Sequence, residues 1–220
     1  MAQRRRKAKA VVEANGAPLV VAVPKGRVLA SIAKRFAASG IPAAALLEDD
    51  RTLERLAPDH GIRFLLLKPD DVPTYVEYGA ADLGIVGRDV LMERDYDLYC
   101  PLDLEIGRCR LVVAGLPGPL PSDRTLRVAT KFMNTAGRYF LGKGQQVDLI
   151  YVQSSVELAP LTGLADLIVD LVESGETLRQ NGLKELEFIC DISSVVITNR
   201  ASLKLKRERI VPLLDALAGA

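Results

Sequence analysis

Two long apolar segments, Arg108–Leu116 and Glu187–Thr198, do most to restrict the folds open to this chain. Each is longer than the strand of a typical small domain. Between them, apolar strand-like runs alternate with amphipathic helix-like runs, which predicts βαβ units and a mainly parallel sheet. Long strands on both sides of such a block predict a chain that crosses twice between two lobes, with a cleft between them.

The same alternation occupies the part of the chain before Arg108. The continuous apolar run at 18–23 is typical of a buried strand, and the amphipathic segment Val28–Ser39 predicts a helix. Further strands are expected at Ile62–Leu67, Ala81–Gly87, Leu126–Thr130, Val147–Val152 and Ala165–Asp170. Further helices are expected at Val72–Tyr78, Thr135–Leu141, Val156–Leu161, Thr177–Asn181 and Leu203–Leu217.

The expected fold is therefore α/β, with two α/β lobes and a doubly crossed hinge, and it resembles the type II periplasmic binding proteins. Lobe I would consist of residues 18–107 plus 193–220, because the last helix would pack back on it. Lobe II would consist of residues 108–192, and the proline- and glycine-rich cluster Leu116–Ser122, which follows the strand Arg108–Leu116, is the clearest boundary signal in the chain. Residues 1–17 are basic and Ala-rich, and we expect a disordered tail there.

Composition excludes several classes of function. The net charge is +1, and the basic start contributes to it, so the body carries no cationic field for nucleic acid. No apolar run reaches the ~18 residues that span a bilayer, and no apolar stretch of a signal peptide follows the basic start. Cys100, Cys109 and Cys190 form no C-x-x-C pair, which favours reduced thiols and a cytoplasmic protein.

The clearest chemical pattern lies between Ala165 and Leu178. The expected strand ends in Asp170, and a loop of small and polar residues, Glu173–Thr177, opens the next helix. Gly175 lets the backbone approach a ligand closely, helix N–H groups favour an anion, and the acidic residue suits ribose hydroxyls. This predicts a sugar-phosphate site, although an ordinary strand–turn–helix with Ser174 as N-cap fits the same residues equally well.

The longer run from Glu157 to Leu178 resembles, position by position, the signature of the ATP phosphoribosyltransferases. The matching residues are Glu157, Gly163, Ala165, Ile168, Asp170, Leu171, Ser174, Gly175, Thr177 and Leu178. The segments Val23–Arg27, Lys68–Val76 and Gly79–Gly87 also resemble the family. The resemblance extends from about Pro18 to Leu217.

The resemblance implies that N1 of the ATP adenine attacks C1 of phosphoribosyl pyrophosphate and expels pyrophosphate. The product is N1-(5-phosphoribosyl)-ATP, at the entry to histidine biosynthesis. A ring nitrogen needs no deprotonation to attack, so the enzyme supplies alignment and charge stabilisation rather than a base. Mg²⁺ is the implied cofactor, held mainly by the phosphates of the substrate and not by a protein cage.

The resemblance also implies roles for individual residues. In lobe II, Asp170 would bind the ribose hydroxyls. The other residues implied in this substrate site are Ser155, Glu157, Glu173, Ser174, Gly175, Glu176, Thr177 and Leu178. In lobe I, Lys25, Gly26 and Arg27 follow the first strand, where open α/β sheets bind phosphates and other ligands. Arg51, Lys25 and Arg27 are the implied catalytic residues, with Arg51 stabilising the leaving group and Lys68 a weaker candidate for that task.

Simpler interpretations stay open for several of these residues. Lys25 and Arg27 could be surface charges beside a turn, and Arg51 could pair with Asp49 or Asp50. His60 lies in an expected turn and receives no catalytic role. The aromatic residues Phe64, Tyr75 and Tyr78 are expected to fill the core or an interface, and not to form a platform for adenine.

One departure from the family pattern and the length of the chain affect these expectations. Members usually carry glycine just before the serine of the Ser-Val-Glu-Leu-Ala-Pro segment, where this chain has Ser154, which weakens the role of Ser155. The length of this chain resembles the short form of the family, so we do not expect the histidine-binding regulatory domain of the long form. The short form depends on a regulatory subunit that resembles a histidyl-tRNA synthetase, so we expect a homodimer within a hetero-oligomer and regulation through that partner.

Two other functions compete with this one. A ligand-binding module of the same two-lobed fold would share the architecture without catalysis. A purine or pyrimidine phosphoribosyltransferase would share the donor, but it carries paired acidic residues where this chain has Val169 beside Asp170.

Overall fold

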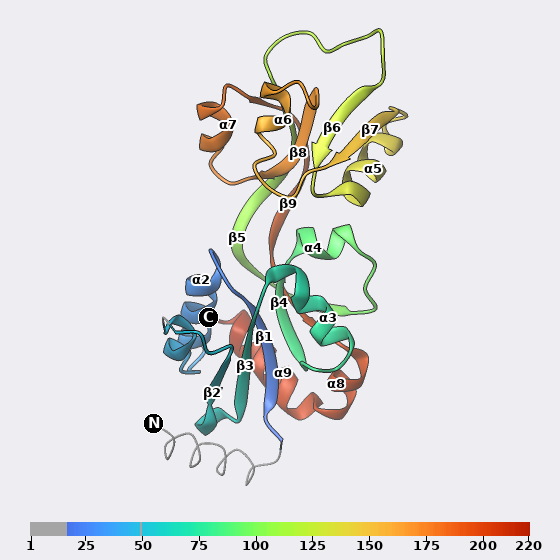
Figure 1. Cartoon of the computed structure of the whole chain (residues 1–220). Helices are drawn as coiled ribbons and strands as arrows, with labels where there is room; N and C mark the ends of the chain where they lie inside the picture. The colour runs from blue at the N-terminus through green and yellow to red at the C-terminus, as the bar shows by residue number, and fades with distance from the viewer. Residues whose placement is uncertain (1–16, 49) are drawn as a thin grey trace. The chain divides into compact units, whose positions relative to one another are not determined.

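The computed structural model describes residues 17–48 and 50–220 (Figure 1). The tail expected at 1–17 therefore lies, apart from Ala17, outside the described residues. The chain divides into two compact units. Unit 1 contains the described residues up to Leu91, Tyr96–Gly107 and Ser193–Ala220, and unit 2 contains Met92–Asp95 and Arg108–Ile192. The fold is the expected α/β arrangement of two lobes, because the long strands β5 (Tyr99–Gly115) and β9 (Lys184–Thr198) each carry residues of both units.

The described strands hydrogen-bond in the order β2-β3-β1-β4-β9-β5-β8-β6-β7. The remaining strands of unit 1 are β1 (Leu19–Pro24), β2 (Glu54–Ala57), β3 (Ile62–Leu67) and β4 (Leu83–Gly87). Its helices are α2 (Leu29–Ala38), α3 (Val72–Glu77), α8 (Arg200–Leu205) and α9 (Arg207–Ala218). Helix α4 (Arg88–Glu93) begins in unit 1, and its last two residues belong to unit 2. Strand β1 pairs in parallel with β3 and β4, whereas β2 is antiparallel to β3 and β9 is antiparallel to β4.

Every residue of β1 is buried because helices cover both faces of the unit 1 sheet. Val21 and Val23 belong to one cluster with Phe36 of α2 and Leu213 of α9. The alternate residues of β1 belong to a second cluster with Val76 of α3. Burial on both faces explains the unbroken apolar run in the sequence.

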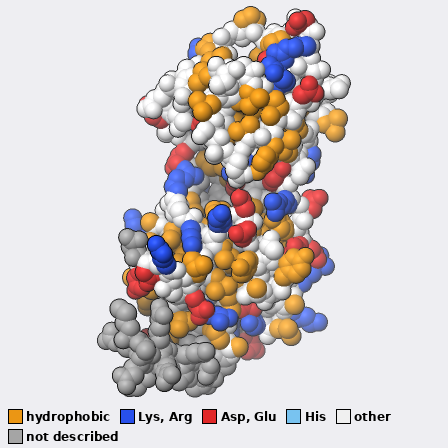
Figure 2. All heavy atoms as spheres, in the orientation of Figure 1, with side chains coloured by type: hydrophobic (Ala, Val, Ile, Leu, Met, Phe, Trp, Pro, Cys, Tyr) orange, Lys and Arg blue, Asp and Glu red, His pale blue; other side chains and the backbone are white. Residues whose placement is uncertain are grey.

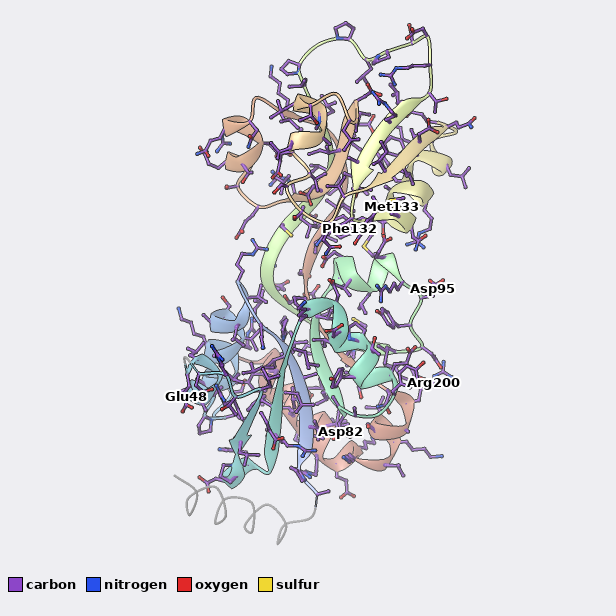
Figure 3. The ribbon with its side chains drawn as sticks, in the orientation of Figure 1. Glu48, Asp82, Asp95, Phe132, Met133 and Arg200 are labelled. Atoms are coloured by element: carbon purple, nitrogen blue, oxygen red, sulfur yellow. The ribbon has the colours of Figure 1, made fainter. Side chains whose placement is uncertain are left out.

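A buried carboxylate, Asp82, ties the C-terminal helices to this sheet (Figure 3). It is 4% exposed and accepts hydrogen bonds from the Val20 backbone N–H at 2.9 Å and the Ser202 hydroxyl at 2.8 Å. The oxygen that accepts from Val20, Oδ2, also lies 2.7 Å from Nζ of Lys206. All these partners belong to unit 1, so the network holds α8 against β1.

Unit 2 has the remaining strands β6 (Leu126–Thr130), β7 (Val147–Tyr151) and β8 (Leu167–Val172), with the helices α5 (Met133–Gly142), α6 (Leu158–Leu161) and α7 (Glu176–Gln180). Strand β6 pairs in parallel with β7 and β8, and β5 is antiparallel to β8. Phe140 of α5 packs on one face of this sheet, whereas Ala159 of α6 and Leu178 of α7 pack on the other.

The segment Met92–Asp95 differs from the boundary expected for lobe I, because it groups with unit 2. The Glu93 carboxylate accepts hydrogen bonds from the backbone N–H groups of Asn134 at 2.8 Å and Thr135 at 3.0 Å. These N–H groups belong to the first turn of α5, which has no intrahelical partners for them. Glu93 therefore supplies the cap of that helix.

Other elements also differ from the sequence expectations. Strand β2 and helix α4 were not expected, β5 begins at Tyr99, and the last expected helix is two helices, α8 and α9. Strand β9 continues without a break through Asp191. Phe64 is a core residue as expected. Tyr78, for which the core or an interface was expected, is 82% exposed and therefore does not lie in the core. No helix in the part of the chain that the structure describes is long and apolar enough to cross a membrane.

Candidate active site

A pocket of about 60 Å³ lies in unit 2, where β8 ends and α7 begins. Its lining residues are Glu157, Asp170, Leu171, Val172, Ser174, Gly175, Glu176, Thr177 and Leu178. The structure therefore brings together most of the unit 2 residues that the signature pointed to. Ser155 and Glu173 are close in the chain but do not line this pocket.

Asp170 is the partly buried acid of this pocket. Burial raises the pKa of its carboxyl above the usual value, and the neighbouring Glu157 carboxylate raises this pKa further. The backbone N–H of Leu171, which donates to Asp170 at 2.8 Å, and the positive charge of Lys131 act in the opposite direction. The site thus holds a carboxylate that is costly to ionise, which is typical of functional positions.

The loop after β8 has a backbone conformation that favours glycine at one position. Gly175 has φ +75°, in the left-handed region that glycine occupies without steric cost. The Ser174 hydroxyl accepts a hydrogen bond from the Glu176 backbone N–H at 3.3 Å. The side chains of Glu176 and Arg179 form an ion pair at 2.5 Å, and Arg179 also donates to the Ser174 carbonyl at 3.2 Å. The loop is therefore stabilised by its own side chains.

Ser155, which lies two residues before the signature begins at Glu157, has an unusual backbone conformation. Its φ is +51°, which is rare for a residue that carries a side chain. Such strain persists where the surrounding structure imposes it, and it is frequent at functional sites. The strained residue directly follows Ser154, which stands where the family usually has glycine.

Lys131 is a charged residue near the pocket that the sequence did not reveal. It follows β6, the neighbour of β8, and lies close enough to Asp170 for its charge to lower the pKa of that carboxyl. The signal that could have identified it is the parallel pairing of β6 with β8, because side chains that follow adjacent parallel strands meet at one edge of a sheet.

The basic residues expected in lobe I gather at one sheet edge of unit 1. Lys25 and Lys68 directly follow β1 and β3, and Pro24 pairs with Leu67 at the ends of these strands. The Lys25 backbone N–H donates to the Leu67 carbonyl at 2.8 Å. Gly26 has φ +100°, so the turn that carries Arg27 depends on glycine.

Arg51 lies shortly before β2 and is exposed. The suggested pairing with Asp50 is not the one in the structure, since the Asp50 carboxylate lies 2.7 Å from Arg55 and accepts a hydrogen bond from the Thr52 backbone N–H. The Thr52 bond and then the Arg55 bond lower the pKa of Asp50. The alternative partner, Asp49, lies outside the described residues.

Comparison with known families and proteins is consistent with this geometry. Residues 68–219 match the model of a family described as HisG, ATP phosphoribosyltransferase. A protein of Sorangium cellulosum (strain So ce56) named ATP phosphoribosyltransferase is 53% identical over 207 residues, which cover 92% of this chain and 96% of the relative. A protein of Citrifermentans bemidjiense with the same name is 49% identical over 205 residues, covering 90% of this chain and 96% of that protein.

Solved structures resemble the chain as well. The ATP phosphoribosyl transferase (HisG:HisZ) complex from Thermotoga maritima contains a chain with 38% identity and a TM-score of 0.78, with coverage of 90% of this chain and 96% of that one. The VFT2 domain of Bordetella pertussis BvgS has a TM-score of 0.59 at 13% identity, and covers 97% of this chain and 91% of that domain. The second likeness concerns the fold alone.

Proposed function

This chain belongs to the ATP phosphoribosyltransferase family, and we propose that the unit 2 pocket binds the phosphoribosyl donor of the family's reaction. The chain transfers the 5-phosphoribosyl group of phosphoribosyl pyrophosphate to N1 of ATP, the first step of histidine biosynthesis. The observation that supports the location is that the signature residues Asp170, Ser174 and Thr177 line one pocket. The pocket lies where α/β sheets bind ligands, beyond the carboxyl end of a strand.

The pocket provides groups for two parts of the donor. The hydroxyls of Ser174 and Thr177, with the backbone around Gly175, suit the 5-phosphate, because hydroxyl and N–H groups donate to phosphate oxygens. The carboxylate of Asp170 suits the ribose hydroxyls, because it can accept the hydrogen bonds that these hydroxyls donate. Glu157 lines the same pocket and adds a second acceptor.

The reaction needs alignment more than proton transfer. The lone pair of adenine N1 forms a bond to C1 while the bond from C1 to the diphosphate oxygen breaks, and the bonding electrons leave with pyrophosphate. Fixing C1 between the two groups lowers the entropic part of the barrier. We assign Lys25, Arg27 and Arg51 of unit 1 to the phosphate charge of the substrates, with Lys68 as a further cation at that edge.

The residues of the pocket suit a magnesium ion held mainly by the substrate. Asp170 and Glu157 offer carboxylate oxygens, the ligands that Mg²⁺ prefers. Within residues 17–48 and 50–220, no group of three or more His, Cys, Asp or Glu side chains is arranged to hold a metal ion. The proposed ion would take most of its ligands from the diphosphate and would neutralise charge on that group.

We further propose that this chain assembles as a homodimer with a HisZ-type regulatory subunit. The chain from Thermotoga maritima that resembles it along 90% of its length comes from a HisG:HisZ complex. We place the enzyme in the cytoplasm, in accord with the free state of Cys100, Cys109 and Cys190, since a reducing compartment keeps thiols unpaired.

The test is formation of phosphoribosyl-ATP by the purified chain with ATP, phosphoribosyl pyrophosphate and Mg²⁺, with and without a HisZ subunit. We expect product in at least one condition, and an increase with the partner if the hetero-oligomer is the working form. Ser174→Ala with Thr177→Val should raise the KM for phosphoribosyl pyrophosphate and leave the KM for ATP unchanged. Product formation with an unchanged KM in this folded double variant would remove the donor from the unit 2 pocket.

A further inference from the structure

Lys131 lies outside the signature, so the resemblance to the family implies no role for its positive charge. It directly follows β6, which pairs in parallel with β8 so that Ala129 lies opposite Ile168. Continuing this register by two residues places Lys131 opposite Asp170, on the same side of the sheet. A cation and the partly buried carboxylate of the pocket are therefore neighbours at the ends of adjacent strands.

The backbone of Lys131 is fixed on both sides. Thr130 is fully buried, and its hydroxyl donates to the Val169 carbonyl at 2.7 Å and accepts from the Phe132 backbone N–H at 2.9 Å. Phe132, labelled in Figure 3, packs in the core of unit 2, and the Lys131 ammonium lies 4.6 Å from the centroid of its ring. Rigid neighbours of this kind hold a functional side chain in place.

The ammonium group of Lys131 donates no hydrogen bond within the described part of the protein. Its contacts there are the Phe132 ring and the electrostatic interaction with Asp170, and neither is a hydrogen bond to its ammonium. An ammonium offers three N–H donors, so this one can bind oxygens of a ligand. Arg179, the cation beside the loop after β8, already binds Glu176 and the Ser174 carbonyl.

Asp170 lies between Lys131 and the loop Glu173–Thr177 after β8, which is the proposed site of the 5-phosphate and is called the phosphate loop below. A side chain at Gly175 would come within 3.3 Å of Glu185 on β9, so the loop leans toward β9. In the order β9-β5-β8-β6, strands β9 and β6 lie on opposite sides of β8, which carries Asp170. With the 5-phosphate in the loop and the ribose on Asp170, the diphosphate on C1 is the charged group left for the β6 side.

We propose that Lys131 is a further substrate-binding residue, which donates hydrogen bonds to the diphosphate of phosphoribosyl pyrophosphate. This inference rests on the proposed donor site in unit 2. Unit 2 then contributes its own cation to the leaving group. Charge-assisted contacts of this type are stronger than neutral ones.

The test compares Lys131→Met, which keeps the length of the side chain and removes its charge, with Lys131→Arg and with the exposed control Lys204→Met. Calorimetry with the full chain measures binding of two probes in the presence of Mg²⁺, namely pyrophosphate and ribose 5-phosphate. Lys131→Met should weaken pyrophosphate binding about ten- to hundredfold and leave ribose 5-phosphate binding unchanged. Lys131→Arg should retain most of the pyrophosphate affinity, and Lys204→Met should behave as the parent chain.

Three results would overturn the inference, provided that thermal melting shows each variant to be folded. Unchanged pyrophosphate affinity in Lys131→Met would exclude a contact with the diphosphate. An equal loss for both probes would mean that Lys131 acts through the shape of the pocket or through Asp170. If ribose 5-phosphate binds equally well to the parent chain and to Ser174→Ala with Thr177→Val, the donor site itself is misplaced, and that result is distinct from a failure of Lys131 alone.

Discussion

Asp170 and Glu157 face the same small pocket, and the charge of Glu157 adds to burial in raising the pKa of Asp170. The ionised form of Asp170 is therefore less stable in the folded protein than in the unfolded chain. The resulting loss of stability is fully present above the folded-state pKa and disappears as the pH falls below the unfolded-state value. Because ionisation of Asp170 lowers the stability of the folded protein, the negative charge of this residue must serve something other than stability.

We predict that Asp170→Asn raises the melting temperature at neutral pH and lowers turnover. The neutral amide can still accept the Leu171 N–H bond but carries no charge beside Glu157. The difference in melting temperature between the two proteins should shrink as the pH is lowered through the carboxyl pKa. Calorimetric melting at a series of pH values checks this, and a variant less stable than the parent at neutral pH would contradict it.

Gly175→Ala should impair the phosphate loop. A Cβ at φ +75° is strained, and it would also approach Glu185 Oε1 at 3.3 Å. We expect a loss of about 1–2 kcal/mol in the free energy of unfolding and a raised KM for phosphoribosyl pyrophosphate. Gly142→Ala is the matched control, because Gly142 has no positive φ and a Cβ there meets open space at the end of α5. It should raise the free energy of unfolding by up to about 1 kcal/mol and leave the KM unchanged.

Ser155→Gly should stabilise the protein by up to about 1 kcal/mol, because glycine accepts φ +51° without strain. Urea unfolding measures this. Ser155→Ala keeps the backbone strain and removes only the hydroxyl, so its effect on KM tests the implied contact with the substrate. A KM unchanged in Ser155→Ala would remove that hydroxyl from the site.

Asp82→Ala should destabilise unit 1 by about 3 kcal/mol. The change leaves Lys206 without its partner and removes acceptors from the Val20 N–H and the Ser202 hydroxyl. We take the lower end of the range for broken buried pairs because Lys206 is 33% exposed and water screens its charge. Urea unfolding tests this, and a loss no larger than that of Lys204→Met would show that the network adds no stability.

The sequence predicted those elements whose own residues determine them. Strand β1 is apolar along its whole length, and β3 and β6 have the expected bounds. Strand β2 could not be predicted, since Glu54–Ala57 is short, half polar and a strand only through pairing with β3. The break between α8 and α9 escaped prediction because one helical spacing fits the apolar residues on both sides of it.

The residues of the candidate site likewise include some that could be predicted from the sequence and others that could not. The loop around Gly175 and the acid Asp170 lie within one continuous segment, so their spacing could be recognised directly. Lys131 is distant from them in the sequence, and only the register of β6 on β8 brings it beside Asp170. The exposure of hydrophobic side chains was also not predictable, and several in unit 2 lie on the surface (Figure 2), among them Leu158, Leu161 and Phe188.

The division of β9 between the two units also governs when each unit can fold during synthesis. Apart from Met92–Asp95, unit 2 is continuous from Arg108 to Ile192 and can pair its strands as soon as that stretch has left the ribosome. Unit 1 must wait, because β4 lacks its β9 neighbour and β1 lacks the cover of α9 until Ser193–Ala220 have been made. The apolar face of β1 that α9 covers therefore lacks this cover until the last part of the chain has been synthesised.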